Sequence, residues 1–261
     1  MRTLLFFYFF INICAAQLYE NTKNSPLSVL SVIEKKQHRP KKIIKDFNPL
    51  WVDSLKLILP CKNVPVPKRT MRLPNAPRKY RNGIHRGIDF FANWGTPVNS
   101  VAAGVVVRAD HNYKEVPADF RVNMLKASAK VGKTPSDIFN NILLGKAVFL
   151  DHGFELVPGF RVITIYSHLS HIENSIKPGY KISAGELIGK SGNTGMREST
   201  IGSKAGSHLH WELILQKDDE EIFLGRNMPN PELYHMLKRI FQELEEQKNL
   251  EFILEIKNHQ D

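Results

Sequence analysis

The chain has 261 residues, of which 42% are hydrophobic and 24% are charged, and its formal net charge is +10. This length and composition allow a full hydrophobic core, so a disordered chain is excluded. They indicate one main globular domain with extensions.

The first sixteen residues have the layout of a secretory signal peptide. Arg2 precedes an apolar run over residues 4–13, and small residues follow up to Ala16. The run is far shorter than the ~20 residues of a membrane span, and no later segment fits one. We therefore predict export to the periplasm or cell envelope with cleavage near Ala16. A membrane anchor at the N-terminus is the alternative, and a lipid on Cys14 is disfavoured because Ile13 is too bulky for the position before it.

The positive charge is concentrated after this segment. Residues 34–81 contain fourteen Lys or Arg against three acidic residues, a net charge of +11, and the rest of the chain sums to −1. Nucleic acid is not expected as a partner, because the chain is predicted to be exported and no stacking aromatics lie between these charges. An anionic polymer or membrane surface outside the cytoplasm is the predicted partner of residues 34–81, and solvated surface charge is the alternative.

The composition predicts four regions. After the signal peptide (1–16), residues 17–72 are basic and contain several prolines, which predicts a linker or pro-region. The main domain is predicted over residues 73–215, and residues 216–261 form a C-terminal extension. Leucines and isoleucines recur at helical spacing from position 233, so the extension is predicted to carry an amphipathic helix that packs on the domain. A surface for a second chain or a partner is the alternative for this helix, and the sequence leaves the oligomeric state unknown.

Short apolar segments separated by Gly and Pro fill the main domain. Their spacing predicts a mainly β fold with antiparallel sheets or a sandwich. The segments are 97–108, 146–151, 161–167, 185–190 and 207–215.

Two segments interrupt this pattern. Residues 117–144 contain two helix-start signals, each with an early proline and an acid in the first turn, and Gly132 separates them. We predict a helical insertion there. Residues 195–207 form a long connection rich in Gly and Ser, which we expect to border the active site and restrict access to it.

The connection leads into a strand that places two imidazoles on one face. Side chains alternate along a strand, so His208 and His210 project from the same side, about 6.6 Å apart along the backbone. Glu212 shares this face, and it is predicted to be a surface glutamate, with contact to His210 as the alternative.

Upstream, His85 and Asp89 offer a nitrogen and an oxygen, both suitable for Zn²⁺. In a straight strand these positions lie ~13 Å apart, too far for one ion. Gly83 and Gly87 give the backbone the freedom to curve, so that both side chains can converge. Together with His210 they supply three protein ligands and leave a fourth position for water, as in catalytic zinc sites.

A further histidine, His168, closes the apolar strand 161–167. The chain has no His-Glu-x-x-His motif and so lacks the glutamate base of that motif. An imidazole has a pKa near neutrality and can serve as the base instead.

Taken in this order, the motifs resemble those of the lysostaphin/LytM-type zinc metallopeptidases, which cut the peptide part of bacterial peptidoglycan. The resemblance covers residues 73–215. The matching blocks are His85-Arg86-Gly87-Ile88-Asp89-Phe90 with Gly95-Thr96-Pro97-Val98, Asp151-His152-Gly153, Tyr166-Ser167-His168-Leu169, and Lys177-Pro178-Gly179 through Ser191-Gly192-Asn193-Thr194-Gly195 to His208-Leu209-His210.

The resemblance implies a duplicated hybrid motif fold, with antiparallel sheets around a groove and one Zn²⁺ ion per chain. It implies that His85, Asp89 and His210 bind the zinc, and that His168 and His208 activate water and stabilise the tetrahedral intermediate. The implied function is hydrolysis of peptide cross-links in peptidoglycan during cell-wall remodelling or division.

The sequence leaves two alternative functions. A non-catalytic member could bind the wall and activate another hydrolase, but the presence of all five site residues argues against it. Residues 177–189 also resemble biotinyl or lipoyl carrier barrels, yet no Met-Lys or Asp-Lys hairpin accompanies them. The insertion and the 195–207 connection fall where groove walls are expected, so the bond that is cleaved does not follow from the resemblance.

Overall fold

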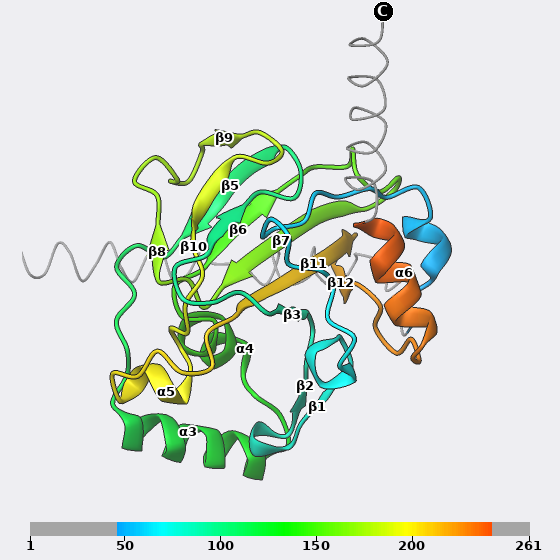
Figure 1. Cartoon of the computed structure of the whole chain (residues 1–261). Helices are drawn as coiled ribbons and strands as arrows, with labels where there is room; N and C mark the ends of the chain where they lie inside the picture. The colour runs from blue at the N-terminus through cyan, green and yellow to red at the C-terminus, as the bar shows by residue number, and fades with distance from the viewer. Residues whose placement is uncertain (1–45, 242–261) are drawn as a thin grey trace, which may run out of the picture. The chain divides into compact units, whose positions relative to one another are not determined.

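The computed structural model of the chain describes residues 46–241 (Figure 1). The chain divides into two units, residues 1–43 and 44–261, and every described residue belongs to the second. The predicted signal peptide and the first part of the predicted linker therefore lie outside the described residues. Among the helices of the described part, none has the length and apolar character that a membrane span requires.

Strands are the main regular elements between residues 46 and 241. Their bounds are β1 Pro77–Arg78, β2 Gly83–Ile84, β3 Ile88–Phe90, β4 Pro97–Asn99, β5 Gly104–Ala109, β6 Val148–Asp151, β7 Arg161–Ser167, β8 His171–Ile172, β9 Lys181–Ile182, β10 Leu187–Lys190, β11 Leu209–Lys217 and β12 Glu220–Phe223. The helices are η1 Pro49–Val52, η2 Thr70–Arg72, η3 Lys79–Arg81, α3 Ala118–Val131, α4 Ser136–Ile138, η4 Phe139–Leu143, α5 Arg197–Thr200 and α6 Glu232–Ile240.

Within the described residues these strands form three sheets. The largest has the strand order β12-β11-β7-β6-β5-β9, and β3 pairs with the first part of β11. The second sheet has the order β4-β10-β8, and the third is the pair β1-β2. Every pairing is antiparallel, which confirms the predicted mainly β, antiparallel fold.

The predicted helical insertion lies between β5 and β6. Helix α3 starts after Pro117 and ends at Gly132, whose φ of +85° is the left-handed geometry that often terminates helices. Helix α4 starts after Pro135 and continues as a π-helical turn, η4. Figure 1 shows α3 beside α5, the short helix of the connection before β11.

Residues ahead of the predicted domain start at position 73 contribute to the main core. Phe47, Val52, Leu55 and Leu57 are buried in the same hydrophobic cluster as the strands. Their spacing lacks a clear period and charged residues lie between them, so the sequence pattern resembled a linker. The domain boundary stays a prediction, but the packed unit extends N-terminally at least to Phe47.

The amphipathic helix of the C-terminal extension is present as α6. It packs against the main core with one face, and its buried residues are Leu233, Met236, Leu237 and Ile240. The part of the predicted pattern that includes Leu244 lies outside the described residues.

Phe241, directly after α6, connects this helix to the strands of the site. Its ring centroid lies 5.4 Å from that of Trp211 and 5.8 Å from that of Phe90. Trp211 and Phe90 are fully buried and stand next to His210 and Asp89 in their strands. Because neighbouring side chains in a strand point to opposite faces, the core packs one face of β3 and β11 and leaves the histidines and the aspartate on the other.

Candidate active site

The site begins with the pairing of β3 and β11. In this antiparallel pair Asp89 lies directly opposite His210. Directly opposed residues project from the same face and are close enough for their side chains to touch. His85 precedes β3, and the turn after β2 brings its ring to within 4.9 Å of the His210 ring, measured between centroids.

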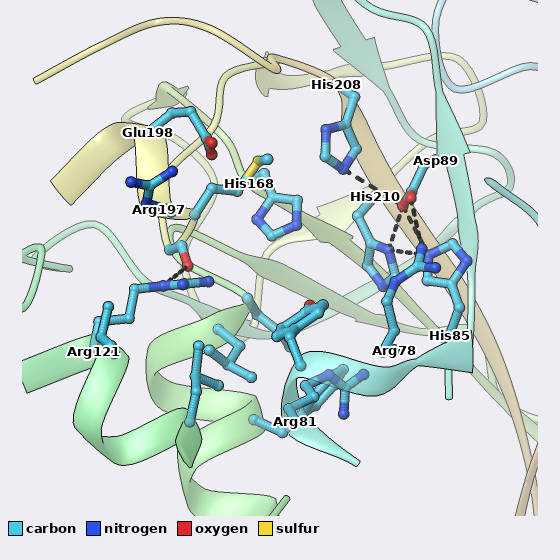
Figure 2. Close-up of a pocket in the computed structure, with 18 of the residues that line it drawn as sticks. Arg78, Arg81, His85, Asp89, Arg121, His168, Arg197, Glu198, His208 and His210 are labelled. Atoms are coloured by element: carbon cyan, nitrogen blue, oxygen red, sulfur yellow. Dashed lines mark hydrogen bonds and ion pairs between the residues drawn. The ribbon is translucent and has the colours of Figure 1, made fainter. Parts of the chain in front are cut away.

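Three ligand-type atoms converge at this point (Figure 2). Nε2 of His85 lies 2.8 Å from Oδ1 of Asp89 and 3.0 Å from Nδ1 of His210. Nδ1 of His210 lies 2.8 Å from the same carboxylate oxygen. These separations are close to the ~3.3 Å edge of a tetrahedron with ~2.0 Å metal–ligand bonds. All three residues are buried, and together they could hold a metal ion.

The opposite nitrogen of each imidazole is already engaged. Nδ1 of His85 lies 2.9 Å from the carbonyl oxygen of Leu73, and Nε2 of His210 lies 2.8 Å from Oε1 of Glu212. Because an oxygen acceptor requires an N–H donor, each ring carries its proton on the nitrogen that faces away from the cluster. The lone pairs of the two inner nitrogens therefore face each other and the carboxylate, and a positive charge between them, either a proton or a metal ion, relieves this repulsion.

The charges around the cluster also favour a cation. Although burial alone raises it, the pKa of Asp89 is held well below its usual range by His85, His208 and His210. Burial alone lowers the pKa of His210, but hydrogen bonds to Asp89 and Glu212 raise it to about 9. A buried site that keeps an imidazole protonated at neutral pH stabilises positive charge. The donor set therefore fits a divalent metal ion.

The second oxygen of Asp89 is held by an arginine that the sequence pattern did not single out. Nη2 of Arg78 donates to Oδ2 of Asp89 over 3.1 Å and to the carbonyl oxygen of Met71, also over 3.1 Å. This contact leaves Oδ1 facing the two histidines. Arg78 thus fixes the orientation of the carboxylate.

Glu212 was predicted to be a surface glutamate, and this prediction is wrong. Its side chain has no exposed surface, and its second oxygen, Oε2, forms an ion pair of 2.9 Å with Nη2 of Arg86. Although burial alone raises it, the pKa of Glu212 is lowered by Arg86 and His210. The prediction failed because alternation along the strand fixes the face of a side chain but not whether other elements cover that face. The position of Glu212 on the same strand face as His210 was the sequence feature that indicated a contact between them.

His168 reaches the site through an unusual backbone conformation. It follows the last residue of β7, and its φ of +61° is in the left-handed region that non-glycine residues seldom adopt. Its Nδ1 lies 2.8 Å from the carbonyl oxygen of Thr194, which leaves Nε2 as the acceptor nitrogen. Burial and the neighbouring His208 and His210 hold the pKa of His168 well below its ordinary value, so the ring is neutral at neutral pH.

His208 stands beside His168, with ring centroids 4.9 Å apart. Its Nδ1 lies 2.7 Å from the carbonyl oxygen of Gly206, and its Nε2 lies 3.5 Å from Oδ1 of Asp89. His208 thus presents Nε2 to the three-residue cluster, and the ring centroid of His168 lies 5.7 Å from that of His210. All five predicted site residues lie together in the structure.

Gly87 serves the site through its lack of a side chain. A Cβ there would lie 2.3 Å from the carbonyl oxygen of Trp211 and 3.0 Å from Cε1 of His210. From the sequence, this glycine was predicted to let the backbone curve, and the structure shows that it also allows β11 to approach closely.

The site opens into a cavity of about 580 Å³. Helix α3, the turn η4 and the start of the 195–207 connection form part of its lining, as expected from the sequence for the groove walls. Apolar and basic side chains of the insertion line the cavity together. The lining residues from α3, η4 and the 195–207 connection are Arg121, Val122, Leu125, Lys126, Phe139, Leu143, Gly195, Met196, Arg197 and Glu198.

Two histidines that are not predicted site residues lie elsewhere. His152 is buried, with Nδ1 2.7 Å from the carbonyl oxygen of Ala103 and Nε2 2.7 Å from Oγ1 of Thr164. His111 lies 2.7 Å from the carbonyl oxygen of Ile176 through Nε2. These contacts give both residues a structural role.

A family model described as peptidase family M23 matches residues 83–222, more than half of the chain. The chain belongs to this family. Its matched region contains the His-Asp-His metal site formed by His85, Asp89 and His210, so the chain is a metallopeptidase of the M23 type.

Two curated relatives match about half of this M23 chain. The peptidoglycan DD-endopeptidase ShyA of Vibrio cholerae is 32% identical over 133 residues, which cover 51% of this chain and 20% of ShyA. An uncharacterised metalloprotease of Haemophilus influenzae is 30% identical over 128 residues, which cover 49% of this chain and 18% of the relative. The chain spans about a fifth of the length of these proteins.

Solved structures of M23 proteins are also similar to the chain. The catalytic domain of lysostaphin from Staphylococcus simulans has a TM-score of 0.34 and 22% sequence identity, with 66% of this chain and 88% of that chain covered. A putative M23 peptidase from Pseudomonas aeruginosa has a TM-score of 0.33 and 26% identity, with 64% and 51% covered.

Proposed function

We propose that the chain is an exported zinc endopeptidase that hydrolyses peptide cross-links in bacterial peptidoglycan. The observation that carries this proposal is the convergence of His85 Nε2, Asp89 Oδ1 and His210 Nδ1 beside two further imidazoles, at the end of an open cavity. The substrate class is supported by ShyA, which is named a peptidoglycan DD-endopeptidase. Because the chain spans only part of such relatives, the substrate is part of the proposal.

Zinc is the metal that this donor set suits. Two imidazole nitrogens and one carboxylate oxygen form a common catalytic zinc set, which leaves a position open for water. When bound, the ion lowers the pKa of water and polarises the carbonyl of the scissile peptide. The chain itself orients the ligands through Leu73, Glu212 and Arg78.

His168 and His208 supply the proton transfers in this proposal. Each ring donates from Nδ1 to a backbone carbonyl, so Nε2 is the nitrogen that remains for the reaction, and both residues line the cavity. One imidazole accepts the proton of the attacking water at Nε2. The other, when it is protonated at Nε2 as well as at Nδ1, donates a hydrogen bond from Nε2 to the oxyanion of the tetrahedral intermediate. Since the backbone carbonyls fix both rings, little reorganisation is needed during the reaction.

The basic segment 34–81 is expected to contact anionic wall polymer. Its residues up to 45 lie outside the described part, and some of its later charges are used within the molecule. Arg72 lies over the ring of Phe91, Arg78 binds Asp89, and Arg81 donates to Thr134. A chain that begins at Asp46, which keeps the packed residues from Phe47 onward, should therefore bind purified wall more weakly than the full mature chain, and equal binding contradicts this role.

Digestion of purified peptidoglycan tests the proposed function. The zinc-loaded mature chain and its His210→Ala variant are incubated with the polymer, and released fragments are identified by mass spectrometry. Fragments cut within peptide cross-links by the unaltered chain alone support the proposal and identify the bond. No fragments from a chain with confirmed zinc overturn it in favour of a wall-binding regulator.

A further inference from the structure

The cavity has two walls of different chemistry (Figure 2). One wall carries the metal site with His85, Asp89 and His210. Figure 2 shows Arg121 and Arg197 on the other side of the pocket, away from these residues. This second wall is built by α3 of the insertion and by α5 of the 195–207 connection.

Arg121 is fixed in place and has hydrogen-bonding capacity left. Its Nε donates to the carbonyl oxygen of Gly195 over 3.2 Å, which ties helix α3 to the connection. Among the described residues, neither of its Nη atoms has a hydrogen-bond or ion-pair partner. The guanidinium therefore has two donor nitrogens for a ligand in the cavity that it lines.

Arg197 lies in a short segment that Glu115 anchors on both sides of it, at Gly195 and at Ser199. Oε1 of Glu115 accepts hydrogen bonds from the backbone N–H of Gly195 over 2.9 Å and from Oγ of Ser199 over 2.6 Å. The side chain of Arg197 itself is exposed and, within the described residues, has no ion-pair partner. A cation on an anchored segment loses less freedom when it binds a ligand than one on a mobile loop.

The second wall of the cavity has more basic than acidic side chains. Arg78 and Arg81 also line the cavity. Arg78 is paired with Asp89, whereas Arg81 donates to the neutral Thr134 and to the carbonyl oxygen of Ile84. The remaining lining cations are Arg121, Lys126 and Arg197, and the acid among the lining residues on this side is Glu198. Glu115 is near, but its carboxylate is occupied by Gly195, Ser199 and Tyr113. The wall thus carries an excess of positive charge opposite the metal site.

We propose that Arg121 and Arg197 bind a carboxylate of the substrate peptide and so select peptides that carry a free carboxyl group near the scissile bond. The inference rests on the proposed function, which makes the ligand a peptide. A guanidinium donates two parallel hydrogen bonds to a carboxylate but not to the neutral amide that replaces it. The carboxylate is either an acidic side chain or the C-terminus of the peptide, and both have the same chemistry.

The test measures binding of a synthetic cross-linked dimer of peptidoglycan stem peptides in four forms. The acidic side chain is free or amidated, and the C-terminus is free or amidated. Calorimetry is done with the full, zinc-loaded chain carrying His208→Ala, which blocks turnover, alone and combined with Arg121→Gln or Arg197→Gln. Lys130→Gln is the matched control. Lys130 is an exposed residue in the last turn of α3 and does not line the cavity, so the variant removes a positive charge from the same helix outside the pocket.

Amidation of the recognised carboxyl group should weaken binding about tenfold, the low end for a charge-assisted hydrogen bond at an exposed site. The amidation that has this effect identifies the side chain or the C-terminus as the source. Each arginine variant should reduce the preference and Lys130→Gln should leave it unchanged. Arg197→Gln is the cleaner variant, since the Arg197 side chain makes no hydrogen bond or ion pair within the described residues, whereas Arg121→Gln also removes the bond to Gly195.

Equal affinity for all four forms overturns the inference. Equal losses for acid and amide forms in both arginine variants also overturn it, because the arginines then act on the structure and not on the carboxylate. The same dimers are offered to the unaltered zinc-loaded chain. Cleavage without a charge preference supports the proposed function and overturns this inference. A charge preference in binding without cleavage supports this inference and contradicts the proposed function.

Discussion

Nε2 of His210 lies 2.8 Å from Oε1 of Glu212, a carboxylate with no exposed surface. The two residues are neighbours on one face of β11, and Arg86 binds the second carboxylate oxygen. The buried charge is thus compensated on both sides. This arrangement fixes the His210 ring and keeps its proton on the nitrogen that faces away from the metal site.

The variant Glu212→Gln tests this role. The neutral amide no longer stabilises the imidazole and leaves Arg86 without its charge partner, so metal affinity should fall about 10- to 100-fold. Competition with a chromophoric chelator measures the dissociation constant. Glu221→Gln, at an exposed position of strand β12, is the control and should bind metal as the unaltered chain does. Equal affinity in both variants contradicts a role for Glu212.

Arg78 acts on the same site through the other ligand. In Arg78→Ala the Oδ2 atom of Asp89 loses its donor and the carboxylate can rotate, so metal affinity should fall about tenfold. The same chelator competition measures the change. Arg69→Ala removes an exposed arginine from the same basic segment and should have no effect. If both variants lose affinity equally, the effect is one of general charge and not of carboxylate orientation.

His168 is expected to serve the reaction and not to bind the metal. His168→Ala should lower kcat by about 10²- to 10⁴-fold, the usual contribution of a proton-transferring group. The metal content, measured by mass spectrometry after gel filtration, should stay the same. Loss of the metal together with activity would mean that His168 belongs to the ligand set.

Much of the site could be predicted because its residues fall into short motifs of fixed spacing. The pair His208 and His210 followed from strand alternation, and the position of Asp89 followed from its motif. The convergence of these residues depends on the pairing of β3 with β11. Asp89 and His210 are 121 positions apart, and no local sequence pattern indicates that they meet. Arg78 and Arg121 are likewise positioned by tertiary packing, so no local pattern identified them.

The strands and the helical insertion were also predictable from hydrophobic periodicity and from Pro and Gly at helix ends. The contribution of Phe47 to Leu57 to the core was not, because an irregular apolar segment is buried only where the folded domain offers a complementary surface. The same limit explains Glu212, whose burial is decided by the elements that cover β11.

The packing of the segment before residue 73 predicts a stability effect. Leu55 is buried in the main core, so Leu55→Ala should reduce the free energy of unfolding by about 2–4 kcal/mol. Leu50 lies in the nearby helix η1 and is 75% exposed, so Leu50→Ala should change it by less than about 0.5 kcal/mol. Urea unfolding followed by circular dichroism compares the two variants. Similar small effects of both would show that this segment contributes little to the folded unit.

We propose that one zinc ion, held by His85, Asp89 and His210, makes this chain a peptidase. The most direct test is to strip the mature chain of metal and add Zn²⁺ stepwise while measuring cleavage of peptidoglycan cross-links. Activity should be absent at the start, rise linearly and reach a plateau at one equivalent of zinc. Cleavage by the metal-free chain, or no cleavage by a chain with one bound zinc, would contradict the claim.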